Sequence, residues 1–206
     1  MEIAGNHLVL FQGDSITDSG RDRADPASLG GGYPMMTAAW FAAAHGGVKA
    51  RFLNRGISGD RVKDLLARWD RDCLDLKPDW LSVLVGINDC WRRYDSGDAT
   101  GVGPFEQAYR GILEPARRAG IRLILMEPFV LHTTPERASW REDLDPKIAV
   151  VRKLAREYSS LLVPLDALFQ EASRDREPSF WAVDGVHPSP AGHALISRAW
   201  LSSVGA

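Results

Sequence analysis

A serine follows the first apolar run of the chain, in the segment Gly13-Asp14-Ser15-Ile16-Thr17-Asp18-Ser19. A serine in a turn from a strand to a helix can act as a nucleophile, because the backbone N–H groups of the turn can stabilise an oxyanion beside it. The alternative is that Asp14 or Ser15 only caps the following helix, and this segment alone favours the cap. The segment also differs from the G-x-S-x-G elbow of α/β-hydrolases, because position 17 is a threonine.

A histidine that can serve this serine as a base lies in the segment Asp184-Gly185-Val186-His187-Pro188-Ser189-Pro190. Such a base needs a second group on one ring nitrogen, which fixes the tautomer while the other nitrogen takes the proton. Asp184, three residues before His187, can fold back on a turn and provide that group. A histidine beside a proline is otherwise usually a surface-loop residue without a role.

Two further polar segments follow predicted strands. In Asn54-Arg55-Gly56-Ile57-Ser58-Gly59-Asp60, the two glycines allow a tight turn and a close approach of the backbone to a ligand. In Gly86-Ile87-Asn88-Asp89-Cys90-Trp91, the uncharged side-chain amide of Asn88 can donate to a developing oxyanion. Taken singly, the first segment is typical of a loop that ends in a capping aspartate, and the second is typical of an Asx-turn.

The elements that must position these segments alternate between strands and helices. Runs of β-branched and large apolar residues predict strands at Leu8–Gln12, Arg51–Asn54, Trp80–Val85, Leu123–Met126 and Leu161–Pro164. Apolar positions at helical spacing predict helices at Tyr33–His45, Asp60–Arg71, Pro104–Arg118, Glu142–Tyr158 and Pro190–Val204. Ser189 is the expected N-cap of the last helix. This alternation favours crossover connections, and therefore an α/β fold whose parallel sheet is covered on both faces.

The polar segments are expected to meet at one edge of this sheet. The irregular stretches Asp18–Gly32, Asp95–Gly103 and Pro128–Trp140 also follow the carboxyl ends of predicted strands, where open α/β sheets place their ligand sites. Together the four polar segments supply a nucleophile, a base, an orienting acid and uncharged donors. These are the parts of an acyl-transfer site, so the combination outweighs the separate structural interpretations.

The composition bounds the class of protein. A chain of 206 residues with 45% hydrophobic and 25% charged residues is expected to form one domain over residues 1–206. The net charge of −2 disfavours nucleic-acid binding, and no apolar run approaches the roughly 20 residues that cross a bilayer. The first residues lack the features of a secretory signal, and Cys73 and Cys90 make no disulfide framework, so a cytoplasmic location is expected.

The four segments resemble the Ser, Gly, Asn and His blocks of the SGNH (GDSL-type) hydrolase superfamily, in the same order from residue 13 to residue 187. The match looks closer to its bacterial acetylxylan esterases, through stretches that include Gly13-Asp14-Ser15-Ile16-Thr17-Asp18, Gly56-Ile57-Ser58-Gly59, Lys77-Pro78-Asp79-Trp80, Gly86-Ile87-Asn88-Asp89, Trp91-Arg92-Arg93-Tyr94-Asp95 and Val186-His187-Pro188-Ser189. The segment Phe180-Trp181-Ala182-Val183 differs from the pattern of that subgroup. This difference concerns the shape of the acyl or sugar pocket.

The resemblance implies a flavodoxin-like three-layer α/β/α fold with a five-stranded sheet, and hydrolysis of acetyl esters on xylan or xylo-oligosaccharides. It implies that Ser15 is the nucleophile, His187 the general base and then acid, and Asp184 the orienting carboxylate. The oxyanion donors are then the backbone N–H groups of Ser15 and Gly59 and the side chain of Asn88. The same family also contains acyl-lipid esterases and thioesterases, which form the alternative function.

Several aromatic residues lie in or near the expected rim loops: Tyr33, Trp91, Tyr94, Trp140 and Trp181. Stacking on sugar rings would account for some of them, although aromatic residues so close to a core more often pack inside it. Trp91 is the strongest candidate for a substrate contact, and Asp14, Tyr33 and Trp181 are the others. Arg92 and Arg93 are compatible with a sugar contact or with simple solvation.

No cofactor is expected. The histidines at 7, 45, 132 and 193 show no metal-ligand spacing, and His193 falls inside the last predicted helix, where a structural role is expected. Gly30-Gly31-Gly32 follows no predicted strand and lacks the residues of a phosphate-binding loop. The expected partner is a small acetyl ester or an oligosaccharide, and the sequence leaves open whether the chain forms a homo-oligomer.

Overall fold

The protein forms one parallel sheet of five strands in the computed structural model, which describes residues 3–206. The strand order is β2-β1-β3-β4-β5, and every neighbouring pair is parallel. The strands are β1 (Leu8–Gly13), β2 (Arg51–Asn54), β3 (Trp80–Leu84), β4 (Arg122–Met126) and β5 (Leu161–Val163). Each agrees with its predicted strand to within one residue at either end, and the parallel α/β sheet is confirmed.

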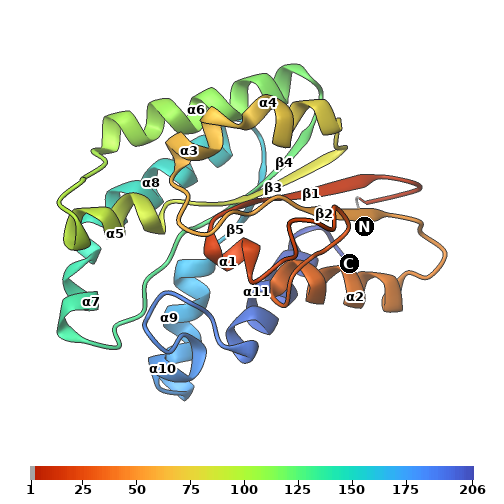
Figure 1. The fold of residues 1–206 in the computed structure, drawn as a ribbon. Helices are drawn as coiled ribbons and strands as arrows, with labels where there is room; N and C mark the ends of the chain where they lie inside the picture. Colours follow the sequence, from red (N-terminus) through yellow and green to blue (C-terminus); the bar gives the residue numbers. More distant parts are fainter. Residues whose placement is uncertain (1–2) are drawn as a thin grey trace.

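Helices cover both faces of this sheet, as Figure 1 shows, so the three-layer arrangement is also confirmed. One face carries the long helices α6 (Val102–Arg118) and α8 (Arg141–Glu157), with the shorter α3 (Val62–Ala67) and α4 (Trp69–Asp72) beside them. The other face carries α2 (Tyr33–Ala44) and α11 (Pro190–Ser203), which pack on each other. The remaining helical elements are α1 (Ser15–Asp18), η1 (Leu74–Leu76), α5 (Ile87–Asp95), α7 (Pro135–Ser139), α9 (Leu165–Asp175) and α10 (Pro178–Trp181).

The helix predicted at Asp60–Arg71 is wrong in detail, because the chain forms α3 and α4 with a break at Arg68. At this break φ is −116° and ψ is 13°. The largely buried Arg68 guanidinium donates to Asp60, to Asp72 and to the Gln12 side chain of β1. These three acceptors hold Arg68 against the sheet, and the helical conformation is interrupted there.

The predicted elements omit the short helical segments α1, η1, α7 and α10, and also two longer helices. Gly86 to Trp91 has the composition of a turn, but Gly86 takes a φ of +134° and is the N-cap of α5, which continues to Asp95. The second missing helix is α9, which begins directly after β5 and buries Leu165 and Phe169 at helical spacing. Both helices fill positions that the sequence patterns left as irregular chain.

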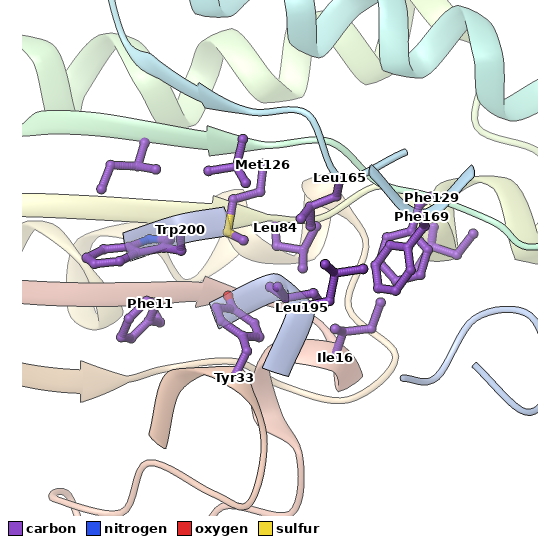
Figure 2. Close-up of a cluster of buried hydrophobic side chains, with 14 of the residues drawn as sticks. Phe11, Ile16, Tyr33, Leu84, Met126, Phe129, Leu165, Phe169, Leu195 and Trp200 are labelled. Carbon is purple, nitrogen blue, oxygen red and sulfur yellow. The ribbon is translucent and has the colours of Figure 1, made fainter. Parts of the chain in front are cut away.

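The core consists of one apolar layer on each side of the sheet. Figure 2 shows part of one layer, in which Trp200 of α11 shares a cluster with Phe11, Leu84 and Met126 from neighbouring strands, and the rings of Phe11 and Trp200 lie 5.5 Å apart. The Trp200 indole N–H donates to the hydroxyl of Ser82 at 3.0 Å, so this buried polar group is satisfied. The packing fixes α11, and with it the segment that precedes α11, against the sheet.

Candidate active site

Ser15 lies at the carboxyl end of β1, in the turn that leads into α1. Asp14 is the N-cap of this four-residue helix, and its carboxylate accepts the backbone N–H of Ile16 at 3.0 Å. The segment therefore contains both features that its sequence left as alternatives, a capping aspartate and a serine available for chemistry. Ser15 is only partly buried, whereas Asp14 is completely buried.

His187 and Asp184 lie on a loop that meets the Ser15 turn from the other end of the chain. The hydroxyl oxygen of Ser15 is 3.0 Å from Nε2 of His187, and Nδ1 of His187 is 2.7 Å from Oδ2 of Asp184. The other carboxylate oxygen of Asp184 accepts the backbone N–H groups of Val186 and His187 at 2.9 and 2.7 Å. An antiparallel bridge between Ala182 and Pro188 closes this loop.

The charges of this pair strengthen the base, because the Asp184 carboxylate stabilises the protonated imidazole that forms when His187 takes a proton. Partial burial disfavours the charged carboxylate of Asp184, but the donors from His187 and Val186 outweigh it and hold the pKa of Asp184 well below its usual range. The hydrogen bond with Asp184 raises the pKa of His187 above its ordinary value, against partial burial. Asp184 therefore stays ionised while His187 titrates.

Three N–H groups on the segments that meet at this edge of the sheet are the candidate oxyanion donors. The backbone N–H groups of Ser15 and Gly59 donate to no protein acceptor among residues 3–206. Gly59 has a φ of +89°, a backbone conformation that L side chains rarely adopt. The side-chain amide of Asn88, on the first turn of α5, donates to the backbone carbonyl of Asp60 at 3.0 Å. That contact orients the amide and leaves its second N–H for a ligand.

Two polar residues that the sequence analysis gave no role hold the glycine loop beside α1. Asp18, at the end of α1, accepts the backbone N–H of Ser58 at 3.0 Å. Asn54, at the end of β2, is completely buried and donates its amide to the carbonyls of Thr17 and Leu29. A polar residue at the end of a predicted strand was the available signal for Asn54. The four predicted segments therefore do meet at one edge of the sheet.

Two of the residues expected to contact a substrate are inside the protein. Asp14 and Tyr33 are both completely buried, so this expectation is wrong for them in the observed structure. The Tyr33 hydroxyl lies 3.1 Å from Oγ1 of Thr17, and its backbone N–H donates to Nδ1 of His193 at 3.1 Å. Tyr33 and His193 thus join α2 and α11 to the turn that carries Ser15, and the expected structural role of His193 is confirmed.

The two tryptophans of the predicted rim differ in position. The Trp91 ring lies 5.8 Å from the His187 ring and remains a candidate for contact with a substrate. Trp181 instead lines a groove of about 820 Å³ between α2, α10 and α11, together with residues such as Trp40 and Phe180. None of Ser15, Asn88 or His187 lines that groove, so the structure does not place Trp181 in the site.

Arg92 and Arg93 follow Trp91 on α5 and are both in ion pairs. Arg92 pairs with Asp95 on the same helix, and Arg93 reaches Asp143 of α8 at 3.2 Å. Within residues 3–206 no group of three or more histidine, cysteine or carboxylate side chains is arranged to hold a metal ion. No helix in this part of the chain is long and apolar enough to cross a membrane.

The profile of the GDSL-like lipase/acylhydrolase family matches residues 11–195. The chain belongs to this family. It is therefore a hydrolase of carboxylic esters, and the serine, histidine and aspartate that meet at the edge of its sheet all lie within the matched region.

Family members with known names support this membership over the whole chain. An acetylxylan esterase from Geobacillus stearothermophilus is 37% identical, and the alignment covers 100% of this chain and 97% of the relative. Its crystal structure superposes with a TM-score of 0.91 at 36% identity, over 100% of this chain and 97% of that one. Among the solved structures of that esterase are catalytic mutants in which a serine, an aspartate or a histidine is replaced by alanine.

More distant members of the family have other names. Thioesterase 1/protease 1/lysophospholipase L1 of Escherichia coli strain K12 is 30% identical, over 85% of this chain and 78% of the relative. A structure described as a putative GDSL-like lipase from Parabacteroides merdae has a TM-score of 0.94 at 33% identity, over 98% of this chain and 97% of that one. The family therefore includes proteins that are named for action on different kinds of acyl group.

Proposed function

We propose that this protein is a serine esterase that removes acetyl groups from acetylated xylan or xylo-oligosaccharides. The chemistry rests on one observation, the chain of contacts from the Ser15 hydroxyl to His187 at 3.0 Å and from His187 to Asp184 at 2.7 Å. The substrate class rests on the similarity over the full chain to an acetylxylan esterase, at 37% identity.

In the first half of the reaction, Ser15 Oγ attacks the carbonyl carbon of the acetyl ester. Nε2 of His187 takes the hydroxyl proton, and the negative charge moves to the carbonyl oxygen. The N–H groups of Ser15, Gly59 and Asn88 stabilise that oxyanion. When the tetrahedral intermediate collapses, His187 returns the proton to the departing sugar oxygen, and Ser15 is left acetylated.

In the second half, His187 takes a proton from a water molecule that attacks the acetyl-serine. The same donors stabilise the second oxyanion, and His187 then protonates Ser15 as acetate leaves. Asp184 remains ionised throughout and keeps the imidazole oriented and its charge balanced. We propose in addition that the Trp91 ring, beside His187, receives the sugar that carries the acetyl group.

The alternative is an acyl-lipid esterase or thioesterase, and the relative from Escherichia coli is the observation that favours it. A long acyl chain needs an apolar cleft that opens beside the nucleophile. The apolar groove of about 820 Å³ between α2, α10 and α11 is lined by none of the candidate catalytic residues. This separation supports the acetyl group over a long chain.

The test is acetate release from acetylated xylo-oligosaccharides, followed by mass spectrometry beside the Ser15→Ala variant. Under this proposal, the oligosaccharide becomes lighter by about 42 mass units for each acetyl group that is removed, and only the unaltered protein causes this change. A series of p-nitrophenyl esters from acetate to decanoate separates the two candidates. Rates that fall steeply beyond short chains support the acetylesterase, and rates that rise toward decanoate support the alternative.

We also propose a cytoplasmic location, in which short oligosaccharides are the substrates rather than polymeric xylan. The two cysteines, Cys73 and Cys90, are buried and unpaired, which suits a reducing compartment. Fractionation of cells that produce the protein from its natural gene tests this location. Recovery in the culture medium would contradict it.

A further inference from the structure

The loop that carries Asp184 and His187 is packed tightly against the chain that follows β4. The backbone N–H of Leu131 donates to the carbonyl of Gly185 at 2.8 Å. Gly185 has a φ of +85°, and a Cβ atom at this position would lie 2.5 Å from the Leu131 carbonyl oxygen. The two segments are therefore in direct backbone contact, and the position of the loop depends on what holds residues 131 to 140.

Arg137, on the short helix α7, makes the side-chain contact between these segments. Its Nε donates to the backbone carbonyl of Asp184 at 2.9 Å. The central carbon of its guanidinium lies 3.9 Å from the ring centre of Trp140 and 4.6 Å from that of Trp91. The side chain is only 14% exposed, although its ion-pair partner Glu136 is largely exposed. The two indole rings also touch each other, with their centres 5.3 Å apart, and a planar cation over both of them in a half-buried site is a strong contact.

Both groups that Arg137 contacts, Asp184 and Trp91, are also neighbours of the candidate base. Asp184 binds Nδ1 of His187, and the Trp91 ring lies 5.8 Å from the His187 ring at an interplanar angle of 52°. We propose that Arg137 is a positioning residue of the ester-hydrolysis site, which fixes the acid–base loop and the indole beside His187 through a single guanidinium. This proposal rests on the proposed function, because it assigns Arg137 to the same catalytic site.

The charge of Arg137 has a separate effect on the base. The titratable groups that act on His187 come from four elements: Asp184 on its own loop, Asp14 before α1, His193 on α11 and Arg137 on α7. The hydrogen bond with Asp184 raises the pKa of His187, Asp14 also raises it, and Arg137 lowers it. Arg137 thus opposes the two carboxylates and keeps more of His187 neutral near neutral pH.

Two substitutions separate position from charge. Arg137→Gln keeps an N–H donor for Asp184 and removes the charge, so the acid limb of the kcat/KM profile should move to higher pH. Arg137→Lys keeps the charge and loses the planar fork, so kcat should fall, by up to about 100-fold if the loop shifts by about 1 Å, without that upward movement. Arg117→Gln is the matched control. Arg117 lies on α6, and its guanidinium also sits over an aromatic ring, that of Tyr158.

A direct readout does not need esterase activity. The imidazole of His187 is titrated by NMR in the unaltered protein and in Arg137→Gln, with His187→Ala used to assign the signal. A higher midpoint in Arg137→Gln supports the proposal. An unchanged or lower midpoint overturns the effect of the Arg137 charge on His187 even if the protein proves to act on another ester, and an inactive protein with the shifted midpoint would instead count against the proposed function alone.

Chemical rescue tests the contact if the substitutions perturb folding. Arg137→Ala leaves a space over the two indoles, and guanidinium ions at millimolar concentration should restore part of kcat/KM in a saturable way. Urea has the same shape without the charge and is the control, which should restore nothing. The role of Arg137 would be overturned if Arg137→Lys had the same kcat as the unaltered protein. It would also be overturned if guanidinium and urea restored kcat/KM of Arg137→Ala equally.

Discussion

The hydroxyl oxygen of Ser15 lies 3.0 Å from Nε2 of His187, although the two residues are 172 positions apart in the chain. The serine is held by a helix of four residues, and the histidine by a turn that its own Asp184 closes. Neither element is long enough to be stable by itself. Their geometry therefore depends on the packing of both ends of the chain against the same edge of the sheet.

This relationship predicts that Ser15 and His187 act as a unit. Ser15→Ala and His187→Ala should each lower kcat on an acetate ester by about 10,000-fold or more, and the double variant should be no slower than either single one. The reason is that a nucleophile without its base, or a base without its nucleophile, performs no part of the reaction. Steady-state kinetics on p-nitrophenyl acetate tests this, and additive losses in the double variant would count against a shared step.

Asp184→Asn should lower kcat by about 1,000- to 10,000-fold. The amide can still accept the backbone N–H groups of Val186 and His187, but its NH₂ would face Nδ1 of His187 and favour the tautomer that cannot accept a proton at Nε2. Because Asp184 raises the pKa of His187, its removal should also move the acid limb of kcat/KM to lower pH. A variant with unchanged kcat would show that the carboxylate has no part in catalysis.

Asn88→Ala should slow the enzyme and leave it measurably active. The loss of one oxyanion donor typically lowers kcat by about 100- to 1,000-fold. KM should change much less, since the donor acts on a charge that develops only in the transition state. A variant in which KM rises and kcat is kept would instead assign Asn88 to ground-state binding.

Gly59→Ala has a matched control elsewhere in the chain. Gly59 and Gly120 both have a positive φ, +89° and +76°, and neither position has an atom that would clash with a Cβ. Each substitution should therefore lower the free energy of unfolding by about 1–2 kcal/mol through backbone strain. Only Gly59→Ala should also lower kcat, because it moves an oxyanion N–H. Equal kcat values for the two variants would remove Gly59 from the donor set.

Asp14 should make the stability of the protein depend on pH. Burial raises the pKa of Asp14 to about 7, against the N–H of Ile16 and the charge of His187. Between about pH 4 and pH 7 the unfolded chain has lost this proton and the folded chain has kept it, so the free energy of unfolding falls as the pH rises.

The corresponding variant is Asp14→Asn, which keeps an oxygen for the Ile16 N–H. Its free energy of unfolding, measured by urea denaturation from pH 4 to pH 8, should decrease less steeply than that of the unaltered protein. Asp75→Asn is the control, because Asp75 is exposed on the surface. Parallel curves for Asp14→Asn and the unaltered protein would show that the buried carboxyl group does not titrate in this range.

The amino-acid sequence by itself determined the features that depend on local chemistry. Apolar runs marked all five strands to within one residue, and the alternation with helices implied a parallel sheet. The three-residue spacing of Asp184 and His187 indicated a turn in which one binds the other, because such a contact is set by local backbone geometry. Polar segments after the strands indicated one shared edge, since parallel strands all end on the same side.

The tertiary structure alone decided which side chains are buried and which distant residues touch. Tyr33 was expected at the rim and lies inside, because α2 packs on α11 and encloses it. Trp181 lines a separate groove, and Arg137 reaches Asp184 across 47 positions of sequence. Contacts of this kind depend on how helices cross and pack after the chain has folded, and no periodicity or spacing within one segment encodes them.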